Sequence, residues 1–404
     1  MSGNKKSIID DNLCYHCLSI STFYKMLKTS TIFLLFFMFM TAHAQNLKKE
    51  FIKHNNINRE YLIYIPESYD ESKQHPLLFN FHGGGGTAKG HLQYFDMRKL
   101  AEDNKFILIY PQGSRIDGKE FDEGQAGKGG KVLGTHWNPE LPSVPHNKSK
   151  ADDYGFLESM IDKIDSDYSI NINKVYLCGF SNGADFALSA ACYFHKKVAA
   201  AASVAGLQSG EIIKSRTPTN SKGIIVVHGD SDPTRPYYNG LKRFGVRFNM
   251  SVPEILSYWV GINQIDEEPI KNSFTYGGQK IEHSKYLDSM GKSLIEHYKV
   301  INGGHTLFDF KVNDKSLNEV IWDFMSKHKI KKPELRIIPT RALPFTFIFN
   351  SENDAKYSLE VSNDLTAWSK LQEVKGTGKQ IEFVDSRKAI FQKQYYRLRV
   401  VLNN

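Results

Sequence analysis

The hydrophobic positions follow two patterns along the chain, and the change between them falls near residue 332. Before it, continuous apolar runs occur at 76–81, 106–110, 174–178 and 223–228, separated by stretches with helical spacing. A run of this length predicts a strand buried on both faces, and alternation of such strands with helices predicts βαβ units. We therefore predict an α/β domain built on a mostly parallel sheet.

The elements between these runs complete the predicted domain. Alternation at 60–65 indicates an early antiparallel strand, and 281–300 is expected to hold a hairpin or two short strands. Helical spacing predicts helices at 97–103, 154–164, 184–193, 253–263 and 316–328. The segment 116–153 has no periodicity, and we interpret it as an insertion on the substrate side, with a plain surface loop as the alternative.

The pattern after residue 332 has period two. Phe, Tyr, Leu, Val and Ile alternate with polar residues at 345–349, 357–361, 381–383 and 396–400. Short alternating strands separated by turn residues predict a small β-sandwich. We therefore expect an α/β catalytic domain at 45–332 and an appended module at 333–404, whose aromatic residues serve core packing or sugar binding.

The first 44 residues form an N-terminal extension with an export signal. Lys25 and Lys28 precede an apolar run at 32–40, which is followed by a small-residue cleavage site ending at Ala44. This pattern predicts a signal peptide with its start at Met26 and cleavage after Ala44. No later segment is long and apolar enough to span a bilayer, so we predict a secreted protein, extracellular or periplasmic, without membrane insertion.

Composition narrows the possible partners. The 404 residues carry a net charge of +8, but the basic residues are scattered and no basic segment is interleaved with aromatic residues. Nucleic-acid binding is therefore not expected. Ligand spacing for a metal and a dinucleotide fingerprint are both missing, so we predict no metal and no cofactor. Cys178 and Cys192 would lie roughly 15 Å apart on a strand and the following helix, beyond disulfide reach.

The sequence Gly-Phe-Ser-Asn-Gly at 179–183 carries the first chemical signal. It lies between an apolar strand and an alanine-rich helix, which is the setting of a nucleophile elbow. Glycines two positions before and after Ser181 allow a sharp turn, and the helix N-terminus behind it favours developing negative charge. We expect Ser181 to be the nucleophile if an acid and a histidine follow in the right order.

Two later loops supply these partners. In elbow-type hydrolases the acid comes after the serine and the histidine after the acid. Asp232 follows the strand at 223–228, and His305 follows two glycines before the last predicted helix. Asp230 is a second candidate for the acid, since one carboxylate could hold the imidazole while the other caps the following turn.

A tetrahedral oxyanion also needs hydrogen-bond donors. The backbone N–H of Asn182 supplies one, and the glycine loop after the strand at 76–81 supplies the second. Gly84 is the preferred donor there, with Gly83 or Gly85 in reserve. His82 is expected to pack or hydrogen-bond beneath this loop.

Together these motifs resemble secreted polyhydroxybutyrate depolymerases and feruloyl or acetylxylan esterases, a group similar to carbohydrate esterase family 1. The resemblance covers roughly residues 59–328. It is carried by Phe-His-Gly-Gly-Gly at 81–85, Tyr-Pro-Gln-Gly at 110–113, Asp-Asp-Tyr-Gly-Phe at 152–156, Lys-Val-Tyr at 174–176, Gly-Phe-Ser-Asn-Gly-Ala at 179–184, His-Gly-x-x-Asp-Pro at 228–233 and Gly-Gly-His at 303–305.

The resemblance implies an α/β-hydrolase fold and ester hydrolysis through an acyl-enzyme on Ser181, with Asp232 and His305 completing the triad. The group's acid precedes a proline, which favours Asp232, and a tryptophan-containing stretch on the group's active-site side implies that Trp137 binds substrate. Many members carry a disulfide-rich framework, which two separated cysteines do not supply, and Asp152 and Asp153 fit a helix cap better than a catalytic role.

The predicted function is therefore a secreted serine esterase acting on carboxylic esters of a polymer or its fragments. The ester substrate would be a polyester or an acylated polysaccharide. Two alternatives are a serine peptidase on the same fold and a non-catalytic adhesion protein. A peptidase of this fold would be expected to carry a gating domain, and a non-catalytic descendant has no physical need of serine, acid, histidine and glycine loop together.

Overall fold

The structure is a computed structural model that describes residues 46–115, 135–140, 151–243, 245–330, 335–338, 345–353, 355–385, 387 and 394–401. The expected signal peptide at 1–44 and most of the insertion at 116–153 lie outside the described residues. Within them, no helix is both long enough and apolar enough to cross a membrane.

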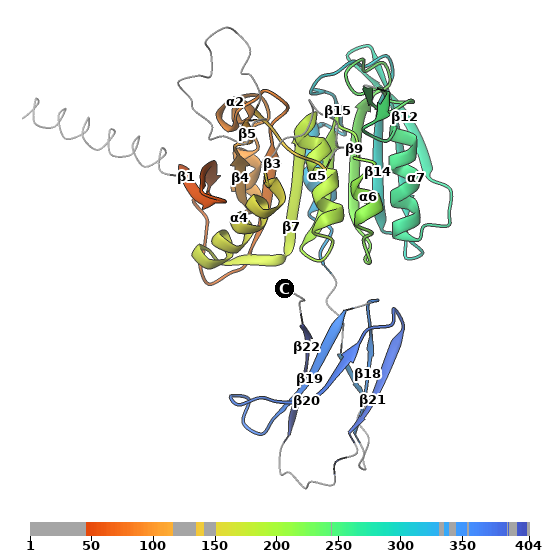
Figure 1. The fold of residues 1–404 in the computed structure, drawn as a ribbon. Coiled ribbons are helices and arrows are strands. Elements are labelled where there is room, and N and C mark those ends of the chain that lie inside the picture. Colours follow the sequence, from red (N-terminus) through yellow and green to blue (C-terminus); the bar gives the residue numbers. More distant parts are fainter. Residues whose placement is uncertain are drawn as a thin grey trace, which may run out of the picture.

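A ten-stranded sheet forms the centre of the α/β domain (Figure 1). Its strands, in spatial order, are β1 (Leu47–His54), β2 (Ile57–Tyr64), β4 (Ile107–Pro111), β3 (His75–Phe81), β7 (Ile170–Phe180), β8 (Val198–Val204), β9 (Gly223–Gly229), β14 (Ser293–Val300), β13 (Gln279–Leu287) and β12 (Ile270–Tyr276). The strands from β4 to β14 run parallel, while β1, β2, β13 and β12 are antiparallel to their neighbours. This is the α/β-hydrolase fold that the sequence predicts.

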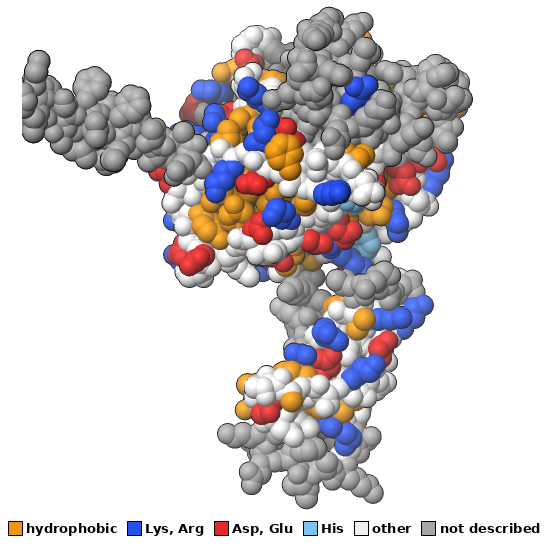
Figure 2. All heavy atoms as spheres, turned by 60° about the vertical axis from the view of Figure 1, so that its left-hand side comes forward, with side chains coloured by type: hydrophobic (Ala, Val, Ile, Leu, Met, Phe, Trp, Pro, Cys, Tyr) orange, Lys and Arg blue, Asp and Glu red, His pale blue; other side chains and the backbone are white. Residues whose placement is uncertain are grey.

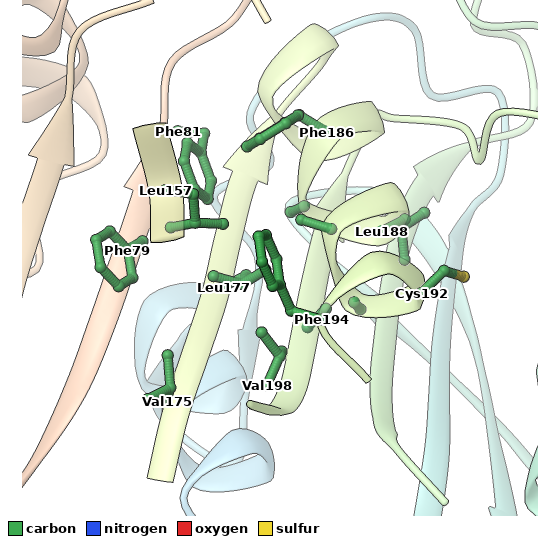
Figure 3. Close-up of a cluster of buried hydrophobic side chains, with 14 of the residues drawn as sticks. Phe79, Phe81, Leu157, Val175, Leu177, Phe186, Leu188, Cys192, Phe194 and Val198 are labelled. Atoms are coloured by element: carbon green, nitrogen blue, oxygen red, sulfur yellow. The ribbon is translucent and has the colours of Figure 1, made fainter. Parts of the chain in front are cut away.

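Helices cover both faces of the sheet because its central strands are apolar on both sides. They are α2 (Ala88–Tyr94), α3 (Arg98–Asn104), α4 (Asp153–Asp167), α5 (Asn182–Tyr193), α6 (Ile212–Ser215), α7 (Val252–Asn263) and α8 (Leu317–Met325). Helices α4, α5 and α7 bury their apolar residues in one core cluster, part of which is drawn in Figure 3. Helices α2, α3 and α8 pack into a second cluster on the opposite face.

Short strand pairs complete the loops around the sheet. They are β5 (Ser114–Arg115) with β6 (Thr135–His136), β10 (Lys242–Arg243) with β11 (Val246–Arg247), and β15 (Lys311–Val312) with β16 (Lys315–Ser316). The pair β5–β6 holds the described part of the 116–153 insertion against the end of β4.

Several elements differ from the prediction. Strand β8 was missed because its sequence, Val-Ala-Ala-Ala-Ala-Ser-Val, consists mostly of a residue that favours helices, yet it is buried throughout between β7 and β9. The outer strands β1 and β12 and helix α2 were also not predicted. Their residues are largely exposed or too few to set a clear period.

The C-terminal residues form two three-stranded antiparallel sheets, ordered β17-β18-β21 and β20-β19-β22. The strands are β17 (Leu335–Ile338), β18 (Phe345–Asn350), β19 (Lys356–Ser362), β20 (Ser369–Lys375), β21 (Gln380–Asp385) and β22 (Tyr395–Val401). Phe349 from one sheet and Tyr357 from the other share a small apolar cluster.

On the face of the protein drawn in Figure 2, basic and acidic side chains are interspersed.

Candidate active site

The elbow places Ser181 at a tight turn between β7 and α5. The backbone of Ser181 has φ 53° and ψ −121°, a strained conformation for a residue with a side chain. A Cβ on Gly179 would lie 2.4 Å from the carbonyl carbon of Gly183, and one on Gly183 would lie 2.3 Å from the oxygen of Phe81. Both glycines are therefore required by close backbone contacts, and the turn leaves the serine hydroxyl at the carboxyl end of the sheet.

The structure brings Ser181, His305 and Asp232 together in one hydrogen-bonded row. The Oγ of Ser181 lies 2.9 Å from Nε2 of His305, and Nδ1 of His305 lies 2.7 Å from Oδ2 of Asp232. Ser181 and Asp232 are 7% and 4% exposed. A hydroxyl within reach of an imidazole that is held by a carboxylate is the arrangement that activates a serine.

The two candidate acids have separate contacts. Asp232 contacts the imidazole, and its Oδ1 accepts hydrogen bonds from the N–H groups of Thr234 and Arg235, each at 2.8 Å. Asp230 instead accepts the N–H of Asn302 at 2.6 Å and so braces the turn that leads to His305. The structure thus gives one carboxylate to the imidazole and the other to a neighbouring turn.

The charge state of Asp232 follows from these bonds. Burial alone would raise the pKa of this carboxyl, but hydrogen bonds from His305 and from the backbone of Arg235 outweigh it and hold the pKa below its usual value. Asp232 is consequently ionised at neutral pH, which suits a group that stabilises a charged imidazole.

The glycine loop lies beside the elbow. A Cβ on Gly83 would be 3.4 Å from the Cβ of Ser181, and one on Gly84 would be 3.5 Å from the Cβ of Asn182. Gly85 is less suited to the role of donor, because its N–H already binds the carbonyl of Thr135 at 2.7 Å. The preferred donor, Gly84, and one reserve, Gly83, therefore lie next to Asn182 and Ser181.

His82 supports this loop from below. Its Nδ1 donates to the carbonyl of Gly83 at 2.8 Å, and its Nε2 accepts the N–H of Gly113 at 2.9 Å. Complete burial lowers the pKa of His82 to about 4. The imidazole is neutral and holds the loop in place, as the sequence predicts.

The prediction that Trp137 binds substrate requires a correction. The indole is only 2% exposed and packs against Phe81 and Phe186, so it presents no open face for a ligand. Its Nε1 donates to the carbonyl of His82 at 3.0 Å, and its backbone exchanges two hydrogen bonds with the side chain of Asn182. Trp137 therefore anchors the insertion to the elbow and the glycine loop.

The adjacent acidic pair is structural, as predicted. Asp152 caps α4 by accepting the N–H of Gly155 at 2.8 Å. Asp153 is buried, forms a 2.7 Å ion pair with Arg59 and accepts the N–H of Asn138. These bonds fix the end of the insertion next to Trp137.

Sequence reasoning missed a buried ion pair close to the triad. Asp185 lies in α5 one turn after Ser181, and Arg235 follows Asp232 by three residues. The guanidinium Nη2 of Arg235 lies 2.8 Å from Oδ2 of Asp185. The available signal was an acidic residue in the first turn of an alanine-rich helix that is mostly apolar.

Two aromatic residues missed by the same reasoning flank the site. The ring of Phe180 lies 5.2 Å from the imidazole of His305, measured between centroids. Tyr94 is 51% exposed, and burial of its hydroxyl raises its pKa, while a hydrogen bond with the backbone of Gly83 opposes this shift. Phe180 therefore packs beside the imidazole of His305, and Tyr94 lies beside the glycine loop.

Cys178 and Cys192 are free and buried, and burial raises the pKa of both thiols. No group of three or more His, Cys, Asp or Glu side chains suited to a metal occurs among the residues described.

A family model described as phospholipase/carboxylesterase matches residues 67–244, a range that contains the glycine loop, Ser181 and Asp232. The part of the chain that contains these residues is thus similar to phospholipases and carboxylesterases. The chain is 24% identical over 272 residues to a probable feruloyl esterase C of Aspergillus terreus, covering 67% of this chain and 85% of the relative.

A second relative is a bifunctional acetylxylan esterase/xylanase of Neocallimastix patriciarum, 23% identical over 288 residues. The alignment covers 70% of this chain but only 35% of that longer protein. Among solved structures, the acetyl xylan esterase from Aspergillus awamori aligns over 69% of this chain and 99% of its own, with 17% identity and a TM-score of 0.47.

Proposed function

We propose that this chain is a carboxylesterase that hydrolyses acyl esters of a polysaccharide, such as feruloyl or acetyl groups. Ser181 would be the nucleophile, His305 the general base, and Asp232 the carboxylate that orients and stabilises His305. The observation that carries the proposal is the unbroken hydrogen-bonded row from Asp232 through His305 to Ser181. The names of the relatives, which are feruloyl and acetylxylan esterases, support this substrate class.

The geometry supports a two-stage reaction. His305 takes the proton of Ser181 as the hydroxyl oxygen attacks the ester carbonyl, and Asp232 stabilises the imidazolium that forms. The N–H groups of Asn182 and Gly84 bind the oxyanion, each contributing about 2.7–4 kcal/mol to the transition state. His305 then protonates the leaving alcohol, and a water molecule activated by the same imidazole releases the acid.

The export signal and the C-terminal sheets fit this proposal. A polymeric substrate lies outside the cell, and the pattern ending at Ala44 would direct the enzyme there. The residues after 332 would then form a separate module carried along with the catalytic domain.

The proposal is tested with four substrates: methyl ferulate, acetylated xylan, p-nitrophenyl acetate and a peptide p-nitroanilide. We expect turnover of the esters and none of the amide, and a fall in kcat of about 10⁶ in Ser181→Ala. Amide cleavage would favour a peptidase, and the absence of turnover of every ester would favour a non-catalytic protein. A residual rate in Ser181→Ala within tenfold of wild type would show that another group is the nucleophile.

A further inference from the structure

A buried ion pair connects the helix of the nucleophile to the loop of the triad acid. Asp185 is 2% exposed, and its backbone N–H donates to the carbonyl of Ser181 at 2.9 Å. Its carboxylate receives Nε and Nη2 of Arg235, with Nε 3.1 Å and Nη2 2.8 Å from Oδ2. The guanidinium thus binds through two nitrogens, a geometry that fixes direction as well as distance.

The carboxylate of Asp185 has one further partner. Its Oδ1 accepts the N–H of Leu207 at 2.7 Å, in the segment that follows β8. The carboxylate is therefore held on one side by the main chain and on the other by Arg235, so that it cannot rotate without losing a bond. It forms a fixed point on the first turn of the nucleophile helix.

The other end of Arg235 reaches the triad acid directly. Its backbone N–H donates to Oδ1 of Asp232 at 2.8 Å, while its carbonyl accepts from Nε2 of His228 at 2.8 Å. Arg235 is only 9% exposed, so its side chain and main chain are both fixed. The position of the Asp232 carboxylate is thereby tied to the helix that begins at Ser181.

We propose that Arg235 and Asp185 are positioning residues, which hold the carboxylate of Asp232 at the correct distance and direction from His305 and Ser181. The contacts form a closed ring: Ser181 to α5 and Asp185, then to Arg235, Asp232, His305 and back to Ser181. A buried ion pair is weak evidence for stability, because desolvation offsets most of the attraction. The ion pair here contributes by fixing the position of Asp232 and not by raising stability. This inference rests on the proposed triad.

The central experiment separates positioning from stability with a double variant, Asp185→Met with Arg235→Met. Removing both charges together leaves no unpaired charge in the core, while the N–H of Leu207 loses its acceptor, so the melting temperature should fall by only about a few degrees. We expect kcat for p-nitrophenyl acetate to fall 10- to 100-fold while KM changes less than threefold. A folded double variant with kcat within twofold of wild type would overturn the proposal.

The pH profile gives a second readout that a purely structural role would not move. A displaced Asp232 stabilises the protonated imidazole less well, so the acid limb of kcat/KM should shift to lower pH in the double variant. A profile that keeps its acid limb while kcat falls would also contradict the positioning role.

Arg235→Lys carries the same test if the double variant does not fold. Lysine keeps the charge but loses the two-nitrogen geometry, so we expect about a tenfold fall in kcat and the same direction of shift. Full activity of Arg235→Lys would contradict the proposal, because a point charge would then be sufficient.

Glu296→Gln is the matched control. Glu296 is a buried carboxylate that accepts hydrogen bonds from His283 and Tyr298 and not from Ser181 or His305. Its variant should keep kcat and the acid limb. Wild type and Ser181→Ala are assayed alongside. If the esterase proposal itself is wrong, the wild type will not hydrolyse the ester or Ser181→Ala will remain active, whatever the Asp185 and Arg235 variants do.

Discussion

The elbow and the acid loop contribute to the same hydrogen-bonded row, but different interactions hold each of them in place. The elbow around Ser181 is contiguous in sequence, and its shape follows from two glycines whose added Cβ atoms would collide with backbone. The acid loop around Asp232 is held by side chains and main-chain groups that come from distant elements, including Asp185 in α5 and His305 after β14.

This difference determines how each region should respond to substitution. A turn maintained by backbone contact has no room for adjustment, so a single added methyl group should disrupt it. A loop held by several hydrogen bonds can lose one and persist in a slightly altered position. We therefore expect damage to the elbow to appear as lost stability, and damage to the acid loop to appear as lost rate.

Among the substitutions that compare the two regions, the largest effect is expected on the acid-loop side, from Asp232→Asn. An amide cannot stabilise the imidazolium and favours the wrong tautomer, so kcat should fall about 10⁴-fold with the fold intact. Steady-state kinetics and circular dichroism measure this. Asp230→Asn is the control, since Asp230 contacts Asn302, Ser231 and Lys299 and not the imidazole, and the substitution should lower kcat less than tenfold. The reverse ranking would assign the acid to Asp230.

On the elbow side, Gly183→Ala should destabilise the protein by about 3 kcal/mol or prevent folding, because the new Cβ would lie 2.3 Å from the oxygen of Phe81. Denaturant unfolding measures the loss. Gly210→Ala is the matched control, as a Cβ there meets nothing within 4 Å. Equal stability of the two variants would remove the claim that close backbone contact shapes the elbow.

Low pH should lower the folding stability, because buried neutral histidines lie near both regions. Burial lowers the pKa of His82, beneath the glycine loop, and of His297, bonded to Tyr237 after the acid loop, to about 4. In the unfolded chain a histidine titrates near 6.5. Between about pH 6.5 and 4 the unfolded state therefore binds protons that the native state does not, and stability falls as pH decreases.

Urea unfolding at several pH values measures this loss, which should amount to a few kcal/mol by about pH 4. In His297→Gln the free energy of unfolding should change less steeply with pH. The carboxyl of Asp232, whose pKa is lowered, contributes stability that is lost only below about pH 4, outside this window. A free energy of unfolding that stays constant between pH 6.5 and 4.5 would contradict the assignment of neutral buried imidazoles.

The smallest effect is expected from Trp137→Phe, which tests the contact between the insertion and the elbow. The variant loses the hydrogen bond from Nε1 to the carbonyl of His82 but keeps an aromatic ring in the core. Stability should fall by about 1 kcal/mol with KM for methyl ferulate unchanged. An increase in KM without loss of stability would restore the role in substrate binding that the sequence suggested.

The sequence predicts the elbow well because its signals are local: an apolar strand, two glycines around a serine and a helix. The strand β8 escaped prediction because burial between neighbouring strands overrides the helical preference of alanine. The edge strands β1 and β12 also escaped prediction, because they are largely exposed and their pairing depends on neighbouring strands and not on their own hydrophobic pattern.

At the site, sequence order placed Ser181, Asp232 and His305 but could not separate Asp232 from Asp230 by spacing alone. That choice depends on side-chain direction, which only the folded loop provides. The pairing of Asp185 with Arg235 joins residues fifty positions apart, and the burial of Trp137 depends on how the insertion folds back over the elbow. Neither leaves a local pattern in the sequence.

The account's central claim is that Ser181 is the nucleophile of an ester-hydrolysing row. A fluorophosphonate probe followed by peptide mass spectrometry tests it most directly, because such a reagent traps the activated serine of this class covalently. We predict a single adduct on the peptide containing Ser181, and no labelling in Ser181→Ala or after heat denaturation. An enzyme that hydrolyses esters but carries the adduct on another residue would contradict the account.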